Sequence, residues 1–446
     1  MIKEFIRSRV ASKVMQNAAN ISRRDKERES REKARRIEKR PHLIYFFHCL
    51  KDPYSYIALR RIPEIKSKYS VDLEIIIVGN PPDITLPEDK MYWEYSLIDA
   101  RRISPFYGIE SLNQSFPPQE KINQGLLTLM NSDKDNILKE ALKIGDFLWK
   151  PERKDIDIKE FPSKEEKRDI TRFLDAGNKK RKKVGHYLGG VFNYEGENYW
   201  GLDRLLHLEE RLTAMKLDKN DSCKVSQRKV INPKSFHHDD EIILEFYPSL
   251  NSPYTYISFE RVKSLCESYC LKVDVKPVLP MLMRNMKIPA YKARYILSDA
   301  AREGYINGTL IDKCFTPLGR PAERAYSLFN YVNQHGKGFD YMNSLMICSF
   351  KEGKNIYKKR ILKKIIQNIG LSWEEALDHL DSDEWKKTLE ENRQSMYKGH
   401  VWGVPGFRLV SESGLDYSVW GQDRFWLIKN AIIQHIEGND GSKRNL

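Results

Sequence analysis

The sequence has no long run of apolar residues and no recognisable export signal. None of its apolar stretches approaches the roughly 18 residues that a membrane-spanning helix needs. The N-terminal segment contains basic residues but no uninterrupted apolar stretch followed by a small-residue cleavage site, so a secretory signal is not expected. These absences predict a protein of a reducing compartment with a cytoplasmic location.

Cysteine is scarce, and its spacing argues against several kinds of site. The six cysteines include no C-x-x-C pair, which opposes a disulfide framework, a dithiol redox motif and a zinc ribbon. Cys266 and Cys270 are four residues apart, but the nearest histidines, His237 and His238, lie in a polar stretch. A metal site needs more ligands than this, so no metal is predicted.

The net charge of +14 is concentrated at the N-terminus. Residues 1–40 contain 14 Lys and Arg against 6 Asp and Glu, which leaves +6 for the other 406 residues. The stretch RRDKERESREKARRIEKR alternates charges in the manner of a solvated helix or a disordered arm. Contact of residues 1–40 with nucleic acid or an anionic membrane is an alternative that we do not favour.

An internal repeat determines the predicted architecture. A chain of 446 residues exceeds the usual size of one hydrophobic core, and residues 43–78 match residues 242–278 as strand, Pro-containing turn, amphipathic helix and strand. Residues 187–207 match residues 402–426, where two short strands lead into W-G-x-D-R and a helix. Each half therefore reads as βαβ, a helical insertion, then ββα.

This repeat predicts an α/β protein with two similar domains. The predicted parts are a basic helical or disordered arm at 1–40, a first domain at 41–213, a linker at 214–240, a second domain at 241–436 and a tail at 437–446. The linker is placed where charge is high and periodicity is poor. The order of elements in each half is that of a thioredoxin fold that carries a helical insertion.

Three motifs of the second half suggest a family. Ser252-Pro253-Tyr254, Gly403-Val404-Pro405 and Trp420-Gly421-Gln422-Asp423-Arg424 together resemble the DsbA-like family that contains 2-hydroxychromene-2-carboxylate isomerases and kappa-class glutathione transferases. The resemblance covers most of residues 241–436, and a weaker copy covers residues 41–213. It implies two tandem thioredoxin-like (DsbA-like) domains.

Ser252 is the predicted catalytic residue. Ser252 to Thr255 stand where dithiol members of this fold carry C-P-x-C, at a helix N-terminus whose N–H groups and dipole favour an anion. Without cysteines this position cannot cycle a disulfide. The resemblance implies that Ser252 instead donates a hydrogen bond to the thiolate of bound glutathione, which lowers the thiol pKa. The alternative is that Ser252 merely caps the helix.

Other residues are implied as cofactor-binding by the same resemblance. Pro405 matches the family's cis-proline, and Val404 would then offer its backbone to glutathione, whereas an ordinary turn proline is the alternative. Gln422 and Asp423 would receive the γ-glutamyl end, although Asp423 can also serve as an N-cap. Asn285 is the nearest candidate for a contacting asparagine. The neighbouring basic residues suit an anionic ligand or a solvated basic face; they are Arg284, Lys287, Lys292 and Arg294.

The first half departs from the pattern at each of these points. Asp52 replaces the serine, Gly190 replaces the proline, and Leu202-Asp203 replaces Gln-Asp. A carboxylate at the helix start would repel a thiolate, so we interpret this half as a degenerate copy that packs on the active one.

The resemblance implies a glutathione-dependent isomerase or glutathione transferase that acts on a small electrophilic substrate. In the isomerase, the thiolate adds to an aromatic keto acid of the 2-hydroxychromene-2-carboxylate isomerase type and later leaves. The alternative is a non-catalytic thioredoxin-fold binding or scaffold protein. We also expect the two halves to form an internal pseudo-dimer.

Overall fold

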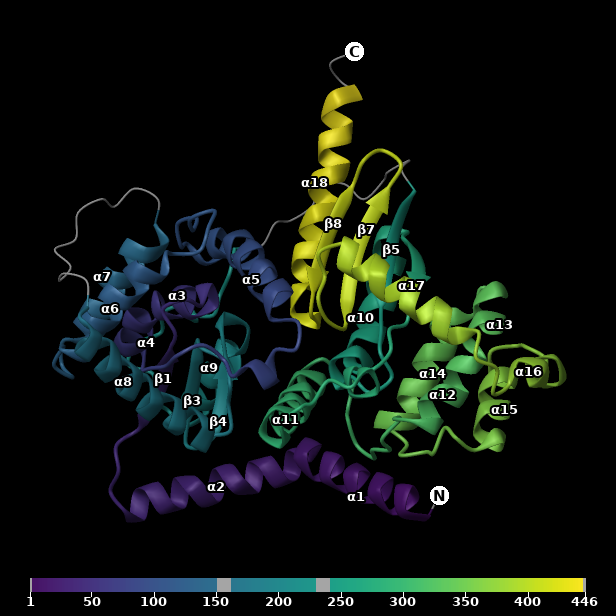
Figure 1. Ribbon diagram of the computed structural model, residues 1–446, viewed down its shortest axis with the longest axis horizontal. Helices are drawn as coiled ribbons and strands as arrows, with labels where there is room; N and C mark the ends of the chain where they lie inside the picture. The colour runs from purple at the N-terminus through teal and green to yellow at the C-terminus, as the bar shows by residue number, and fades with distance from the viewer. Residues whose placement is uncertain (1, 151–161, 230–240, 444–446) are drawn as a thin grey trace. The chain divides into compact units, whose positions relative to one another are not determined.

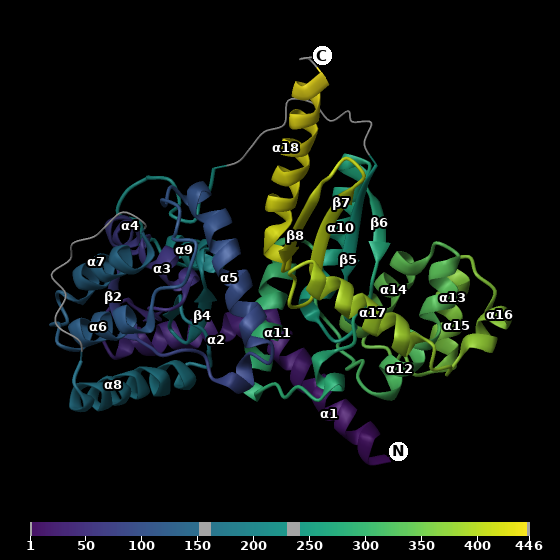
Figure 2. The same cartoon turned by 45° about the horizontal axis from the view of Figure 1, so that its top comes forward.

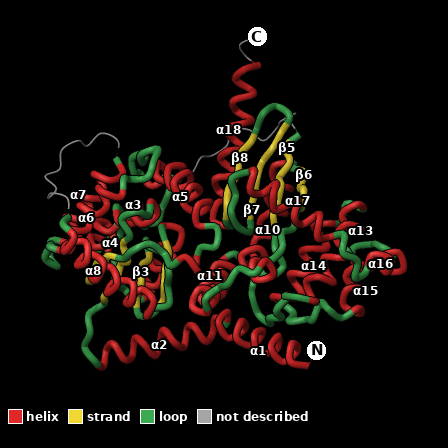
Figure 3. The backbone as a smooth tube through the Cα atoms, viewed as in Figure 1, coloured by secondary structure: helices red, strands yellow, loops and turns green. Residues whose placement is uncertain are grey.

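The computed structural model describes residues 2–150, 162–229 and 241–443 (Figure 1). The chain forms two compact units, one of residues 25–230 and the other of residues 1–24 together with 231–446. In each unit, helices surround a small sheet (Figure 3). No helix in the described residues is both long and apolar enough to cross a membrane.

The unit of residues 25–230 contains a four-stranded sheet in the order β2-β1-β3-β4. The strand β1 pairs parallel with β2 and antiparallel with β3, and β3 pairs antiparallel with β4. The strands are β1 (Leu43–His48), β2 (Asp72–Ile77), β3 (Val191–Tyr194) and β4 (Glu197–Trp200). The helices are α3 (Pro53–Leu59), α4 (Ile62–Lys68), α5 (Asp89–Ile103), α6 (Gln119–Met130), α7 (Ile137–Trp149), α8 (Lys164–Lys183) and α9 (Leu205–Ala214), and α2 (Ile21–Ile37) begins in the other unit.

The other unit repeats this sheet with the order β6-β5-β7-β8 and the same parallel and antiparallel pairings. Its strands are β5 (Ile242–Tyr247), β6 (Lys272–Val275), β7 (Gly406–Ser411) and β8 (Asp416–Trp420). Its helices are α1 (Ile2–Ala19), α10 (Pro253–Tyr269), α11 (Ala290–Ile306), α12 (Arg320–Ser327), α13 (Phe329–Gln334), α14 (Gly338–Phe350), α15 (Lys359–Asn368), α16 (Trp373–His379), α17 (Trp385–Lys398) and α18 (Phe425–Lys443). Figures 1 and 2 show α12 to α16 gathered beside the sheet as a helical insertion.

The core of this unit forms around β5, which lies between β6 and β7. Phe246 of β5 is fully buried, stacks on Phe407 of β7 with ring centroids 5.3 Å apart, and contacts Phe259 of α10 at 5.0 Å. A central strand covered on both faces needs apolar residues at successive positions, which the run Ile242 to Tyr247 largely supplies. The end of β5 is therefore held rigidly where the chain turns into α10.

One hydrogen bond recurs in both units at positions 200 residues apart. The Tyr54 hydroxyl donates to Asp99 Oδ2 at 2.8 Å, and the Tyr254 hydroxyl donates to Asp299 Oδ2 at 2.7 Å. Each bond joins the start of the helix after the first strand to the helix that follows the second strand. The helices α5 and α11 are thus aligned in the same way on α3 and α10.

The N-terminal helix α1 packs on α11 and on the loop after it. The Thr316 backbone N–H donates to Ser12 Oγ at 3.0 Å, and the Ser298 hydroxyl donates to the Ala18 carbonyl at 3.0 Å. Ser12 is buried, and its partner Thr316 lies 304 residues away in the sequence. The first half of the basic arm is therefore an element of the unit that contains residues 231–446.

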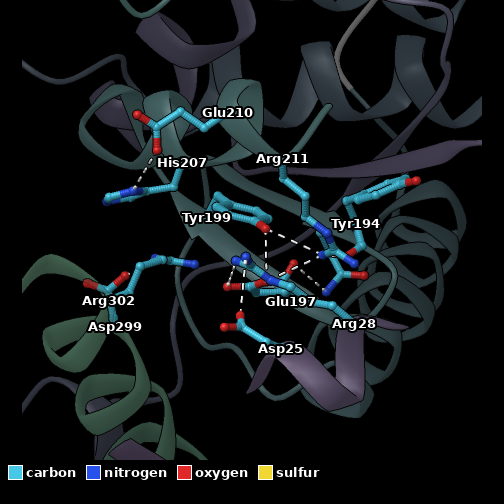
Figure 4. Close-up of polar contacts among 11 residues, drawn as sticks. Asp25, Arg28, Tyr194, Glu197, Tyr199, His207, Glu210, Arg211, Asp299 and Arg302 are labelled. Atoms are coloured by element: carbon cyan, nitrogen blue, oxygen red, sulfur yellow. Dashed lines mark hydrogen bonds and ion pairs between the residues drawn. The ribbon is translucent and has the colours of Figure 1, made fainter. Parts of the chain in front are cut away.

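The helix α2 is anchored by arginine and carboxylate pairs to the β3–β4 hairpin (Figure 4). Both oxygens of Glu197 accept from Arg28, at 2.7 and 2.8 Å, and Glu197 also accepts from Tyr199 at 2.9 Å and from Arg211 at 3.3 Å. Arg40 pairs with Glu195 of the same hairpin at 2.6 Å. Several arginines of the arm thus have acidic partners within the fold.

The polar stretch at 214–240 is described up to residue 229. The backbone N–H groups of Val225 and Ser226 donate to the Glu209 carboxylate at 2.7 and 2.8 Å, and the Lys229 N–H donates to the Phe106 carbonyl at 2.8 Å. This part packs on the unit of residues 25–230, and residues 230–240 lie outside the described residues. The tail predicted at 437–446 continues the helix α18 to residue 443.

Candidate active site

Ser252 is the N-cap of α10, a helix of 17 residues. Its hydroxyl oxygen accepts from the Thr255 backbone N–H at 3.1 Å, and its own N–H donates to the Ser249 carbonyl at 3.1 Å. Pro253 stands at the first helical position, where its missing N–H costs nothing. The half-buried hydroxyl therefore lies at the positive end of a long helix, with its own proton still available to donate.

Thr255, which stands at the position of the second cysteine in C-P-x-C, is fully buried. Its hydroxyl accepts from the Ser249 N–H at 3.4 Å. Tyr254 points instead to Asp299, which also binds the Arg302 guanidinium. Of the three hydroxyl-bearing residues at this turn, Ser252 is the one whose side chain is neither fully buried nor bound to Asp299.

The Val404–Pro405 peptide bond is cis, the conformation that the resemblance implies at this position. Pro405 directly precedes β7, whose first residue, Gly406, pairs with Tyr247 at the end of β5. The Pro405 carbonyl accepts from the Gly421 N–H at 2.9 Å. The chain enters α10 a few residues after Tyr247, so the cis peptide and Ser252 lie at the same edge of the sheet.

Gln422 is buried, and its side-chain amide is hydrogen-bonded to other residues of the same domain. Its oxygen accepts from the Arg261 guanidinium, and its nitrogen donates to Glu303 Oε2 at 2.8 Å and to the Asp423 carboxylate. The predicted role of Gln422 in binding a ligand therefore rests on its backbone, not on its amide. Asp423 is half-buried beside it.

Asn285 ends a short 3-10 helix at Met281–Arg284. It has a left-handed backbone with φ 59°, and its side chain is exposed. Within the described residues, this side chain forms no hydrogen bond, while the preceding Arg284 donates to the Tyr397 hydroxyl at 3.0 Å. A ligand contact from Asn285 is consistent with its exposure and stays a prediction.

Lys292, one of the basic residues for which the sequence leaves an anionic ligand and a solvated basic face open, is a buried cation. Its side chain lies near the start of α11 and is 4% exposed, and burial lowers its pKa to about 8. It precedes Asp299 by seven residues, which is about two helical turns, so both lie on the same face of α11. Since Asp299 holds Tyr254, this face is turned toward the start of α10.

The first half supports this placement of Lys292. Tyr92 stands on α5 where Lys292 stands on α11, 200 positions earlier, and the matching tyrosine and aspartate bonds give both helices one register. Tyr92 is buried, as Lys292 is. The repeat offset is therefore the signal in the sequence that indicates the burial of Lys292.

Asp52 closes the corresponding position in the first half. It is fully buried, and its Oδ1 accepts from the N–H groups of Tyr54 at 2.9 Å and Ser55 at 3.3 Å. Burial raises the pKa of Asp52 to about 7. A Cβ added at Gly189 would lie 2.9 Å from Asp52 Oδ2, so the backbone just before β3 also packs closely against Asp52. The N–H groups that a ligand would use are taken by the protein's own carboxyl.

Cys49, next to this turn, is also unsuited to thiol chemistry. It is buried, and the loss of solvation together with the nearby Asp52 raises the pKa of its thiol to about 12. Every cysteine in the structure is a free thiol. The first half therefore offers neither a reactive cysteine nor an open helix start.

Comparison with known proteins supports the fold of the second half. A family model described as a DSBA-like thioredoxin domain matches residues 243–433. The C-terminal half is thus a DsbA-like thioredoxin domain with an inserted helical part. No curated protein matches the sequence.

Solved structures similar to the chain include both isomerases and disulfide reductases. A 2-hydroxychromene-2-carboxylate isomerase shares 19% identity, with a TM-score of 0.38 over 45% of this chain and 98% of that chain. A cytosolic disulfide reductase, DsbM from Pseudomonas aeruginosa, shares 17% identity, with a TM-score of 0.32 over 44% of this chain and 98% of that chain. A putative protein disulfide isomerase from Nitrosomonas europaea shares 16% identity, with a TM-score of 0.35 over 42% and 97%.

Proposed function

We propose that the DsbA-like domain of residues 243–433 is a glutathione-dependent isomerase of the 2-hydroxychromene-2-carboxylate isomerase type, or a glutathione transferase that uses the same site. The observation that carries this proposal is the Ser252 hydroxyl at the start of α10, in the place where dithiol members of the fold have a cysteine. With Ser252 and Thr255 at the two cysteine positions, the turn cannot exchange disulfides. It can, however, hold a thiolate that a ligand brings.

The residues around the turn fit a peptide-like anionic thiol. The Ser252 hydroxyl donates to the sulfur, and the N-terminus of α10 favours its negative charge. Backbone groups of Val404, beside the cis peptide, are offered to the cysteinyl part of the tripeptide. Asp423 lies in the short 3-10 helix Gln422–Arg424 that precedes α18, where it can receive the ammonium of the γ-glutamyl group.

Lys292 supplies the second positive charge of the site. A lysine with a pKa near 8 is still mostly protonated at neutral pH, and its ammonium attracts a thiolate or a substrate carboxylate. Its low exposure excludes water and so strengthens that attraction. When bound, glutathione supplies a nucleophile that adds reversibly to an electron-poor double bond. The protein's part is to orient that thiol and keep it ionised.

Calorimetric titration of reduced glutathione tests the proposal. We expect the wild type and Asp52→Ala to bind equally, because Asp52 belongs to the closed half. Ser252→Ala should bind the ligand with a higher thiol pKa, which the ultraviolet absorbance of the thiolate reports as a function of pH. Absence of binding at millimolar glutathione would contradict the enzyme and leave a non-catalytic thioredoxin-fold scaffold.

A further inference from the structure

The loop before α15 and the helix itself carry a dense cluster of positive charge. Residues 351–364 contain seven Lys and Arg and one acidic residue, Glu352. Lys354 is half-buried and pairs with Glu352 at 2.9 Å. Five exposed residues make up what we call the α15 basic surface; they are Lys358, Lys359, Arg360, Lys363 and Lys364.

This surface is built on a rigid support. The opposite side of α15 is anchored in the helical insertion by Leu362, Ile365 and Ile366, all of which are buried. The helix α15 belongs to the helical insertion that Figures 1 and 2 show beside the sheet, and it is not part of the Ser252 turn. Among the described residues, none of the five cations of the α15 basic surface forms an ion pair with a carboxylate.

Helix stability does not explain the cluster. Lys359 and Arg360 occupy the first turn of α15, which has no acidic residue, so their charges add to the positive end of the helix dipole. The helix α8 shows the opposite arrangement, with Glu165 and Glu166 in its first turn and basic residues in its last. The charges of α8 stabilise their helix, whereas those of α15 oppose theirs.

The chemistry of the surface favours phosphate. Four of its five cations are lysines, which act as point charges toward phosphate groups. Lys359 and Lys363, like Arg360 and Lys364, are four residues apart, or about 6 Å along the axis, so one strand of phosphates can meet several of them. No large apolar side chain of the described residues 351–364 is exposed for insertion into a bilayer.

We propose that the α15 basic surface binds the phosphate backbone of a nucleic acid without regard to base sequence. The arginines of the N-terminal arm are less suited to this role, because Arg28 and Arg40 already have acidic partners. The α15 basic surface instead leaves its charges to solvent. Binding there is independent of the Ser252 site.

Fluorescence anisotropy with a labelled mixed-sequence DNA duplex and a single-stranded RNA tests this surface. The test variant is Lys359→Gln/Lys363→Gln/Lys364→Gln, and the matched control is Lys179→Gln/Lys182→Gln/Lys183→Gln, which removes three exposed lysines from α8. We expect the test variant to lose about tenfold or more in affinity at low salt. The slope of log K against log salt should shrink by roughly 2 to 3, which corresponds to three lost phosphate contacts.

Three results would overturn the proposal. The first is no binding of either probe by the wild type at low salt. The second is an equal loss in the test and control variants, which would reflect net charge alone. The third is wild-type binding to phosphatidylserine vesicles without binding to nucleic acid. A single cooperative thermal unfolding transition in both variants, as in the wild type, verifies that the substitutions leave the fold intact.

Discussion

Ser252 has a structural and a proposed chemical role, and the two can be separated. Its hydroxyl oxygen caps α10 through the Thr255 N–H, so Ser252→Ala should destabilise the protein by about 1 kcal/mol. Ser372 caps α16 in the same way, through the Glu375 N–H at 3.3 Å. We therefore expect Ser372→Ala to cost similar stability and to leave glutathione binding unchanged. Equal effects of both variants on the thiol pKa would reduce Ser252 to a cap.

We expect Lys292 to lower the free energy of unfolding and to strengthen ligand binding. Its pKa is lowered from 10.5 to about 8 in the folded protein, so folding disfavours its charged form. That cost grows as pH falls from about 10.5 to about 8 and is fully present below pH 8. At pH 7, Lys292→Met should therefore raise the free energy of unfolding by roughly 1–3 kcal/mol and weaken ligand binding.

The effect of Lys292 on ligand affinity should depend on pH. S-methylglutathione has no ionisable thiol, so its affinity for the wild type should fall as pH rises through about 8 and Lys292 loses its proton. Lys292→Met should lack this fall. Lys287→Met, an exposed neighbour, should behave as wild type. A fall of the same size in the Lys292 variant would assign the titration to another group.

Asp52 should make the protein less stable as pH rises. Its pKa is raised from 3.8 to about 7 by burial, so the folded state binds a proton that the unfolded state releases between these values. Stability from this group is complete below about pH 4 and is lost as pH approaches 7. Asp52→Asn keeps an oxygen for the α3 cap and has no charge. We expect it to be stabilising by roughly 1–3 kcal/mol at pH 8 and near neutral at pH 4, as measured by urea unfolding.

Residue roles could be predicted only where they depend on local sequence. Ser252 before Pro253 is a local signal for a helix start, and the structure has that cap. The internal use of the Gln422 amide could not be predicted, because Arg261 and Glu303 are distant in sequence. Lys292 stands among basic residues for which the sequence leaves an anionic ligand and a solvated face open, and its burial depends on tertiary packing.

At the scale of elements, the repeat was the most informative feature of the sequence. The apolar strands and the W-G-x-D-R segments predicted two βαβ and ββα arrangements, and both sheets have the same strand order and pairing. The helical insertions could be predicted only as helical, since amphipathic patterns do not specify which helices meet. Alternating charge in the arm left helix and disorder open; residues 2–19 and 21–37 are helices.

The docking of α1 depends on a buried hydrogen bond. Ser12→Ala would leave the Thr316 N–H without its acceptor, at a cost of about 1–3 kcal/mol. Ser30, which is exposed on α2, provides a matched control, and Ser30→Ala should be neutral. Hydrogen exchange of α11 should increase in the Ser12 variant alone. Unchanged exchange would mean that α1 contributes little to the stability of α11.

For the whole molecule, the net charge had suggested a basic tail on a nearly balanced body. In the structure, Arg28 and Arg40 of the arm pair with acidic residues of the β3–β4 hairpin, and an exposed cluster of positive charge lies on α15. The internal pseudo-dimer of the two halves stays a prediction. Solution scattering that fits two separated, independently moving bodies would contradict it.

The packing of α1 has a consequence for biosynthesis. Ser12 and its partner Thr316 are 304 residues apart, so a ribosome that adds about 5–20 residues per second needs roughly 15–60 s between them. Throughout that interval α1 has been made but its docking surface has not. The nascent chain must therefore carry this segment undocked while residues 25–230 are synthesised.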